Sequence, residues 1–67
     1  RQFDKDIARI ERSMARLDEQ VSGVHEQMAL CVTDHERLAE LTTQLSDLQG
    51  RRQGLEQEWF EVAERLT

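Results

Sequence analysis

Apolar residues recur at alternating intervals of three and four along almost the whole chain, in two runs separated by one short break. This spacing is typical of helices that bury a narrow apolar seam, made of heptad positions a and d, against a partner helix. The first run contains Phe3, Ile7, Ile10, Met14, Leu17, Val21, Val24, Met28 and Cys31. The second contains Leu38, Leu41, Leu45, Leu48, Arg52, Leu55, Trp59, Val62 and Leu66, and Arg52 is its one polar member.

The two runs can serve as partners for each other. When residues are paired so that their numbers add to 69, each a position of one run meets a d position of the other, as for Val24 with Leu45. A connection of roughly two to six residues can join antiparallel helices but cannot return along a helix of roughly 40 Å to start a parallel one. The spacing predicts an all-α fold, a two-helix antiparallel coiled-coil hairpin, with helices at about residues 3–31 and 34–66 and a turn at about 32–33.

The sequence around the break also indicates how the second helix begins. Thr33 is followed three residues later by Glu36, which is the pattern of a capping box at a helix start. We expect Thr33 to cap the second helix, and its replacement by Ala to cost about 1 kcal/mol. No Ser, Thr, Asp or Asn precedes Phe3, so we also expect residues 1–67 to be a single domain excised from a larger protein.

Arg52 occupies an a position opposite Leu17 in this register. Its aliphatic stem can lie along the seam while the guanidinium group reaches the edge near Asp18. A single polar residue at such a position more often fixes register and partner than performs chemistry. Among the aromatic residues, Trp59 is expected to pack on Ile10, whereas Phe60 should stay partly exposed as a docking surface or a weak dimer contact.

Composition argues against an enzyme and against a membrane protein. The chain has only 67 residues, of which 34% are charged, and it contains no Pro, two Phe and one Trp, so it cannot enclose a large core. A hairpin offers no desolvated pocket for acid or base catalysis. The single cysteine, Cys31, lacks an internal disulfide partner, and with His25 and His35 it does not form a metal-ligand pattern. No apolar run is long enough to span a bilayer, so we expect a soluble, cytoplasmic segment.

Four basic residues recur along the outer face of the first predicted helix. They are Lys5, Arg9, Arg12 and Arg16, called the basic stripe below. The first sixteen residues hold five basic and three acidic side chains, although the whole chain has a net charge of −5. Such a stripe can contact phosphates. The alternative is a solvated face whose charges pair with the neighbouring acidic residues Asp4, Asp6 and Glu11. No aromatic residue interleaves with the stripe to stack on bases.

The second half of the chain resembles the closing helix of the C-terminal domain of ABC-F ATPases of the Uup type. The resemblance rests on the segment Leu38-Ala39-Glu40-Leu41-Thr42, on Leu45 and Leu48, and on the stretch from Leu55-Glu56 to Trp59. It implies a cytoplasmic domain at the end of a protein whose two ATPase cassettes lie upstream and hold ATP and Mg, with no cofactor in this domain. Relatives act on ribosomes or nucleic acid, and the terminal coiled coil of the Uup type is associated with DNA binding.

The chain departs from this family pattern in two respects. Many relatives have a longer tip with Pro and Tyr, both absent here, and the chain is acidic overall. The basic stripe therefore becomes the best candidate for nucleic-acid contact. The function expected from the sequence is a non-catalytic accessory domain that assists the binding of DNA or ribosomal RNA. The alternative is a coiled-coil module for protein interaction or weak homodimerisation that does not bind nucleic acid.

Overall fold

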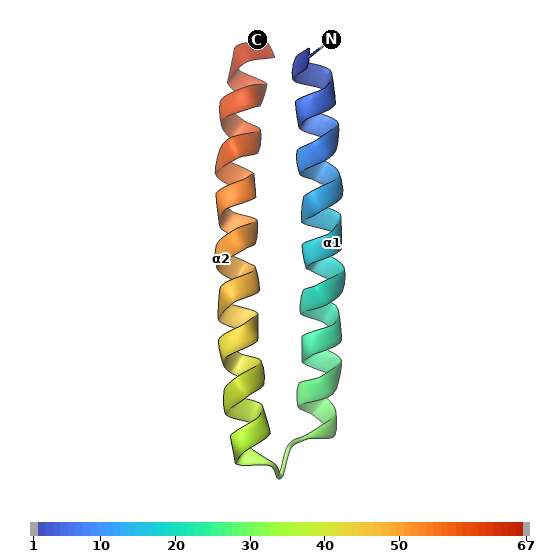
Figure 1. Ribbon diagram of the computed structural model, residues 1–67, viewed down its shortest axis with the longest axis vertical. Helices are drawn as coiled ribbons and strands as arrows, with labels where there is room; N and C mark the ends of the chain where they lie inside the picture. Colours follow the sequence, from blue (N-terminus) through green and yellow to red (C-terminus); the bar gives the residue numbers. More distant parts are fainter. Residues whose placement is uncertain (1, 67) are drawn as a thin grey trace.

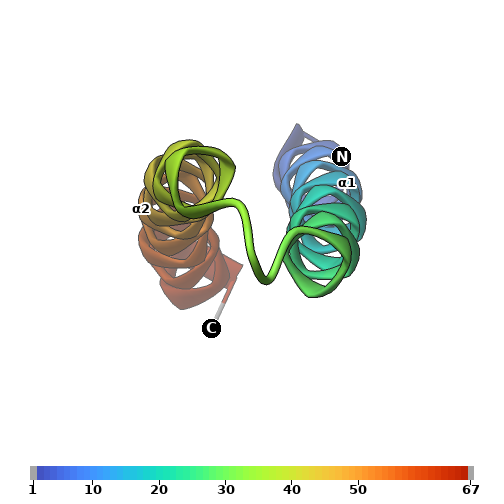
Figure 2. The ribbon, with the colours of Figure 1, turned by 90° about the horizontal axis from the view of Figure 1, so that it is seen from below.

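The computed structural model describes the backbone of residues 2–66 and the side chains of residues 4–66. Helix α1 (Gln2–Leu30) and helix α2 (His35–Leu66) lie side by side and run in opposite directions (Figure 1). The molecule measures 50 × 14 × 13 Å, and the start of α1 lies at the same end as the last turn of α2. Viewed from the turn, the two helices form one layer, and the short connection runs between their near ends (Figure 2). The predicted all-α hairpin is confirmed.

The apolar seam is where the helices meet, and its most buried members share one heptad position. All occupy position d: Ile10, Leu17, Val24, Leu41 and Val62. Their partners at position a in the predicted register, such as Trp59 opposite Ile10, are half-buried. Because each helix has only one neighbour, the seam is covered from one side and remains open at its edges. Ion pairs between the helices agree with the predicted register. Asp18 pairs with Arg52, and Arg9 pairs with Glu58. The residue numbers add to 70 and 67, within two of the predicted sum of 69.

The seam opens at the end opposite the turn. Leu66, predicted to pack against Phe3, is 49% exposed, because α2 ends there and no further turn covers it. The side chain of Phe3 lies outside the described side chains. Phe60 is 61% exposed, as expected, and its ring meets that of Trp59 edge to face with centroids 5.4 Å apart.

The turn corrects the predicted cap of the second helix. The N–H of Asp34 donates to the carbonyl of Cys31 at 3.0 Å, and α2 begins at His35, one residue later than expected. The Oδ1 atom of Asp34 accepts the backbone N–H of Arg37 at 3.1 Å, while its carbonyl accepts from Leu38. Asp34 is therefore the N-cap residue. The capping box that started at Thr33 was a wrong prediction, because the turn places Thr33 one residue ahead of the cap.

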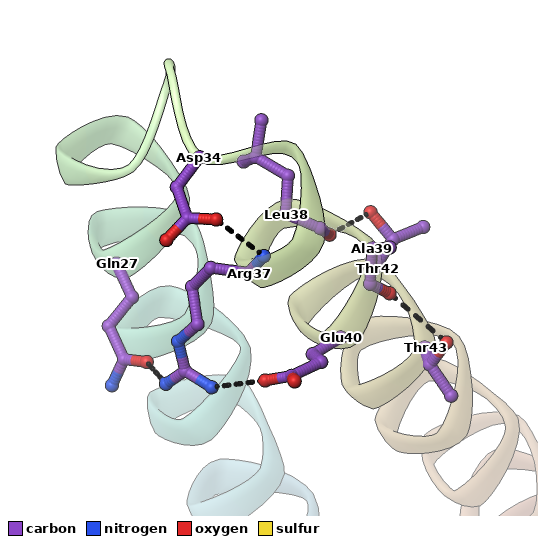
Figure 3. A network of polar contacts seen from close by, with 8 residues as sticks. All are labelled: Gln27, Asp34, Arg37, Leu38, Ala39, Glu40, Thr42 and Thr43. Carbon is purple, nitrogen blue, oxygen red and sulfur yellow. Dashed lines mark hydrogen bonds and ion pairs between the residues drawn. The ribbon is translucent and has the colours of Figure 1, made fainter.

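Arg37 ties the start of α2 to α1 (Figure 3). Its guanidinium group donates to Gln27 Oε1 on α1 and to Glu40 Oε2 on its own helix, both at 3.0 Å. One turn further along α2, the hydroxyl groups of Thr42 and Thr43 donate hydrogen bonds to the backbone carbonyls four residues earlier, at 2.8 and 3.1 Å. The two helices are thus linked beside the turn by Arg37, and the cap satisfies the start of α2.

Arg52 lies in the seam as the sequence predicts. Its Nε donates to Asp18 Oδ1 at 2.6 Å, and another guanidinium nitrogen pairs with Glu56 one turn along α2. The hydrogen bond to Asp18 is the main cause that raises the pKa of the Arg52 guanidinium above its ordinary value. Leu17, opposite Arg52 in the register, is only 9% exposed. A cation therefore occupies the seam without leaving its apolar partner open to water.

Candidate nucleic-acid interface

The residues of the basic stripe lie on the surface of α1, outside the apolar seam. All four members, Lys5, Arg9, Arg12 and Arg16, are exposed. They alternate between heptad positions f and c, which are neighbours on the outer surface of a helix. From Lys5 to Arg16 the stripe spans about 16 Å at 1.5 Å per residue. The helix thus brings these side chains to one surface.

One member of the basic stripe is engaged by the second helix. Arg9 Nη2 lies 2.8 Å from Glu58 Oε1, and the two residues are 51% and 44% exposed in their side chains. The hydrogen bond to Glu58 is the largest cause that raises the pKa of the Arg9 guanidinium above its ordinary value. Glu58 therefore neutralises Arg9, whereas the sequence interpretation had considered only acidic neighbours on the same helix.

The other three members remain available. Within the described part of the chain, no ion pair involves Lys5, Arg12 or Arg16. The alternative was that Asp4, Asp6 and Glu11 neutralise the stripe. For these three cations the structure shows no such pairing within the described part of the chain. Three positive charges face solvent on one side of a chain that is otherwise acidic.

A shallow open groove of about 490 Å³ extends this surface onto α2. It is lined by Arg16 and Arg51, by Ser13 and Gln20, and by Leu17, Gly54 and Leu55 along its floor. A Cβ atom built on Gly54 would meet nothing within 4 Å, so the space beside this residue is open. Arg51 is anchored by Asp47 at 3.1 Å. Two arginines, one from each helix, therefore border a groove open to solvent.

Sequence reasoning missed Arg51 as part of this surface. The predicted register already indicated this position. In it the g positions of the two helices face each other, so Arg51 lies next to Gln20, one helical turn from Arg16. Guanidinium groups bind phosphate oxygens through paired N–H donors. Lys5, Arg12 and Arg16 can contact a phosphate backbone without reading bases, whereas Arg51, like Arg9, already pairs with an acidic side chain.

The described residues offer little to other kinds of site. Among the described residues, no group of three or more His, Cys, Asp or Glu side chains is placed to hold a metal ion. No helix in the described part of the chain is long and apolar enough to cross a membrane. A groove of about 430 Å³ on the opposite edge of the hairpin is lined by Met14, Trp59 and Phe60 together with Glu11, Arg52 and Glu56.

Comparison with known proteins agrees with this architecture. The model of one protein family, described as the ABC transporter C-terminal domain, matches residues 1–64. Neither the curated proteins nor the solved structures gave a match. The family model covers nearly all of the chain, including both helices and the turn. The chain therefore belongs to the family of ABC transporter C-terminal domains.

Proposed function

We propose that this hairpin is a non-catalytic accessory domain of a cytoplasmic ABC-F ATP-binding protein of the Uup type, and that it assists the binding of DNA or ribosomal RNA. Family membership supports the accessory role. The ATPase cassettes, with their ATP and Mg, lie upstream in the same chain under this proposal. The observation that carries the nucleic-acid part is the exposure of Lys5, Arg12 and Arg16 without acidic partners in the described chain.

The geometry favours contact with the phosphate backbone. Double-stranded DNA carries one negative charge per about 1.7 Å of its axis, so several phosphates lie within reach of a stripe about 16 Å long. The surface carries no exposed aromatic side chain between its cations, which disfavours base stacking. The net charge of −5 opposes tight binding by the isolated domain. We therefore expect the domain to bind nucleic acid weakly, with an affinity that depends on salt and not on base sequence.

A salt titration of duplex DNA binding tests this proposal. Affinity should fall steeply between about 50 and 200 mM salt, with a slope that reports the number of neutralised phosphates. Replacing Lys5, Arg12 and Arg16 together by Gln should reduce the slope by about three. Arg9→Gln is the matched control, because Glu58 already occupies Arg9, and this variant should change the slope much less.

The outcomes separate the proposal from its alternative. If the wild-type chain does not bind duplex DNA or ribosomal RNA at about 50 mM salt, the nucleic-acid proposal fails. It also fails if the triple variant and Arg9→Gln have the same effect. The alternative function, a protein-interaction module, draws on the exposed Phe60 and on the groove that it lines with Met14 and Trp59. Phe60→Ala should then weaken partner binding without changing the salt slope for DNA.

A further inference from the structure

A regular order of charges lies on the outer face of α1, away from α2. Four charged residues occupy the same heptad position, f, at intervals of seven, namely Lys5, Arg12, Glu19 and Glu26. All four are exposed. Within the described part of the chain none of them takes part in an ion pair. The hairpin itself therefore does not use these charges.

The order of the four charges is self-complementary. Two basic residues come first and two acidic residues follow, so a second α1 laid antiparallel, with numbers adding to 31, places Lys5 opposite Glu26 of the second copy and Arg12 opposite Glu19 of the second copy. The same two contacts recur with the copies exchanged. A two-fold interface requires this reciprocity, because each contact between residues i and j must also occur between j and i.

The rest of α1 supports the antiparallel orientation. The first sixteen residues hold five basic and three acidic side chains, whereas residues 17–30 hold three acidic side chains and no Lys or Arg. A parallel second copy would bring like charges together along this face, and like charges placed opposite each other are costly. Position b beside the charges carries the small residues Ala8, Ala15 and Ser22. Helix axes can therefore approach to about 8–10 Å, which charged side chains span.

We propose that the outer face of α1 is a self-association surface for a second copy of this chain. The two α1 helices lie antiparallel, the two-fold axis passes beside Ala15, and reciprocal Lys5–Glu26 and Arg12–Glu19 ion pairs fix the register. Because these pairs are exposed, the dimer is weak and salt-sensitive. It covers Lys5 and Arg12, so dimer formation competes with the phosphate contacts of the basic stripe. Arg16 lies close to the two-fold axis and therefore near Arg16 of the second copy, and the repulsion between these two cations opposes association.

Analytical ultracentrifugation of the whole chain tests the surface. At about 50 mM salt the average mass should rise with concentration above the 7.9 kDa of one chain, and at about 500 mM it should return to that value. The variant Glu19→Lys with Glu26→Lys should raise the dissociation constant at least about tenfold, because cations then face cations. Adding Lys5→Glu and Arg12→Glu restores opposite charges in reverse order and should restore the dimer.

These results also separate self-association from DNA binding. Glu19→Lys with Glu26→Lys should weaken the dimer and strengthen DNA binding, whereas Arg16→Gln should weaken DNA binding and leave the dimer intact or tighter. Circular dichroism confirms that each variant remains helical. A wild-type chain that stays monomeric at low salt and millimolar concentration would overturn the proposal. So would an unchanged dissociation constant for the double variant, or a folded fourfold variant that remains monomeric.

Discussion

Asp34→Ala isolates the contribution of the observed helix cap. In the structure the Asp34 carboxylate accepts the N–H of Arg37 at 3.1 Å, so alanine leaves one backbone donor at the start of α2 without its side-chain partner. Loss of an Asp cap costs about 0.5–2 kcal/mol, typically about 1. For a domain of this size 1 kcal/mol corresponds to roughly 4–8 °C in Tm. Asp34→Asn keeps an acceptor oxygen and should lose only the charge interaction with the helix dipole, about 0.3–1 kcal/mol.

Thr33→Ala is the matched control, since Thr33 precedes the cap by one residue. We expect its free energy of unfolding to stay within about 0.5 kcal/mol of the wild type. Urea denaturation followed by circular dichroism gives both free energies, and an unchanged m-value shows that the same surface is exposed on unfolding. Should Thr33→Ala destabilise the hairpin as much as Asp34→Ala does, the assignment of the cap to Asp34 is refuted.

Three further variants probe the seam and the basic stripe. Leu41→Ala removes a fully buried side chain and should lower the free energy of unfolding by about 2–5 kcal/mol in urea denaturation; the control Leu30→Ala, at a side chain 84% exposed, should have little effect. Arg52→Leu should raise Tm while weakening control of the oligomeric state, and a lower Tm with an unchanged mass in ultracentrifugation contradicts this. Glu58→Gln frees Arg9 from its ion pair and should steepen the salt slope of DNA binding by about one, so an unaltered slope argues against phosphate contact by Arg9.

The sequence predicted the fold well because heptad spacing alone determines which face of each helix is buried. Positions a and d of both runs are buried or half-buried from Ile7 to Val62, and the register is met within two residues by the Asp18–Arg52 pair and by the Arg9–Glu58 pair. The orientation followed from the length of the connection. These features depend on periodicity, which the sequence displays directly.

Details that depend on three-dimensional side-chain reach were not predictable in the same way. Thr33 and Asp34 can both cap a helix, and the choice between them is made by the turn, in which Asp34 donates to Cys31. Heptad arithmetic pairs g positions with g positions, which puts Ser13 opposite Glu58. A long arginine at position c, Arg9, reaches Glu58 instead. For that reason one cation of the basic stripe, Arg9, is paired with α2 and not free. Binding of nucleic acid by the stripe stays a prediction.

Two apolar side chains are exposed to solvent at the turn end of the hairpin. Leu30 and Val32 are 84% and 66% exposed, and they lie at the far end of a molecule that is 50 Å long, opposite the end where α1 begins. Because the two helices pack against each other between Ile7 and Val62, the hairpin acts as a narrow arm. A molecule that contacts these two aliphatic side chains therefore lies several helical turns away from the start of α1.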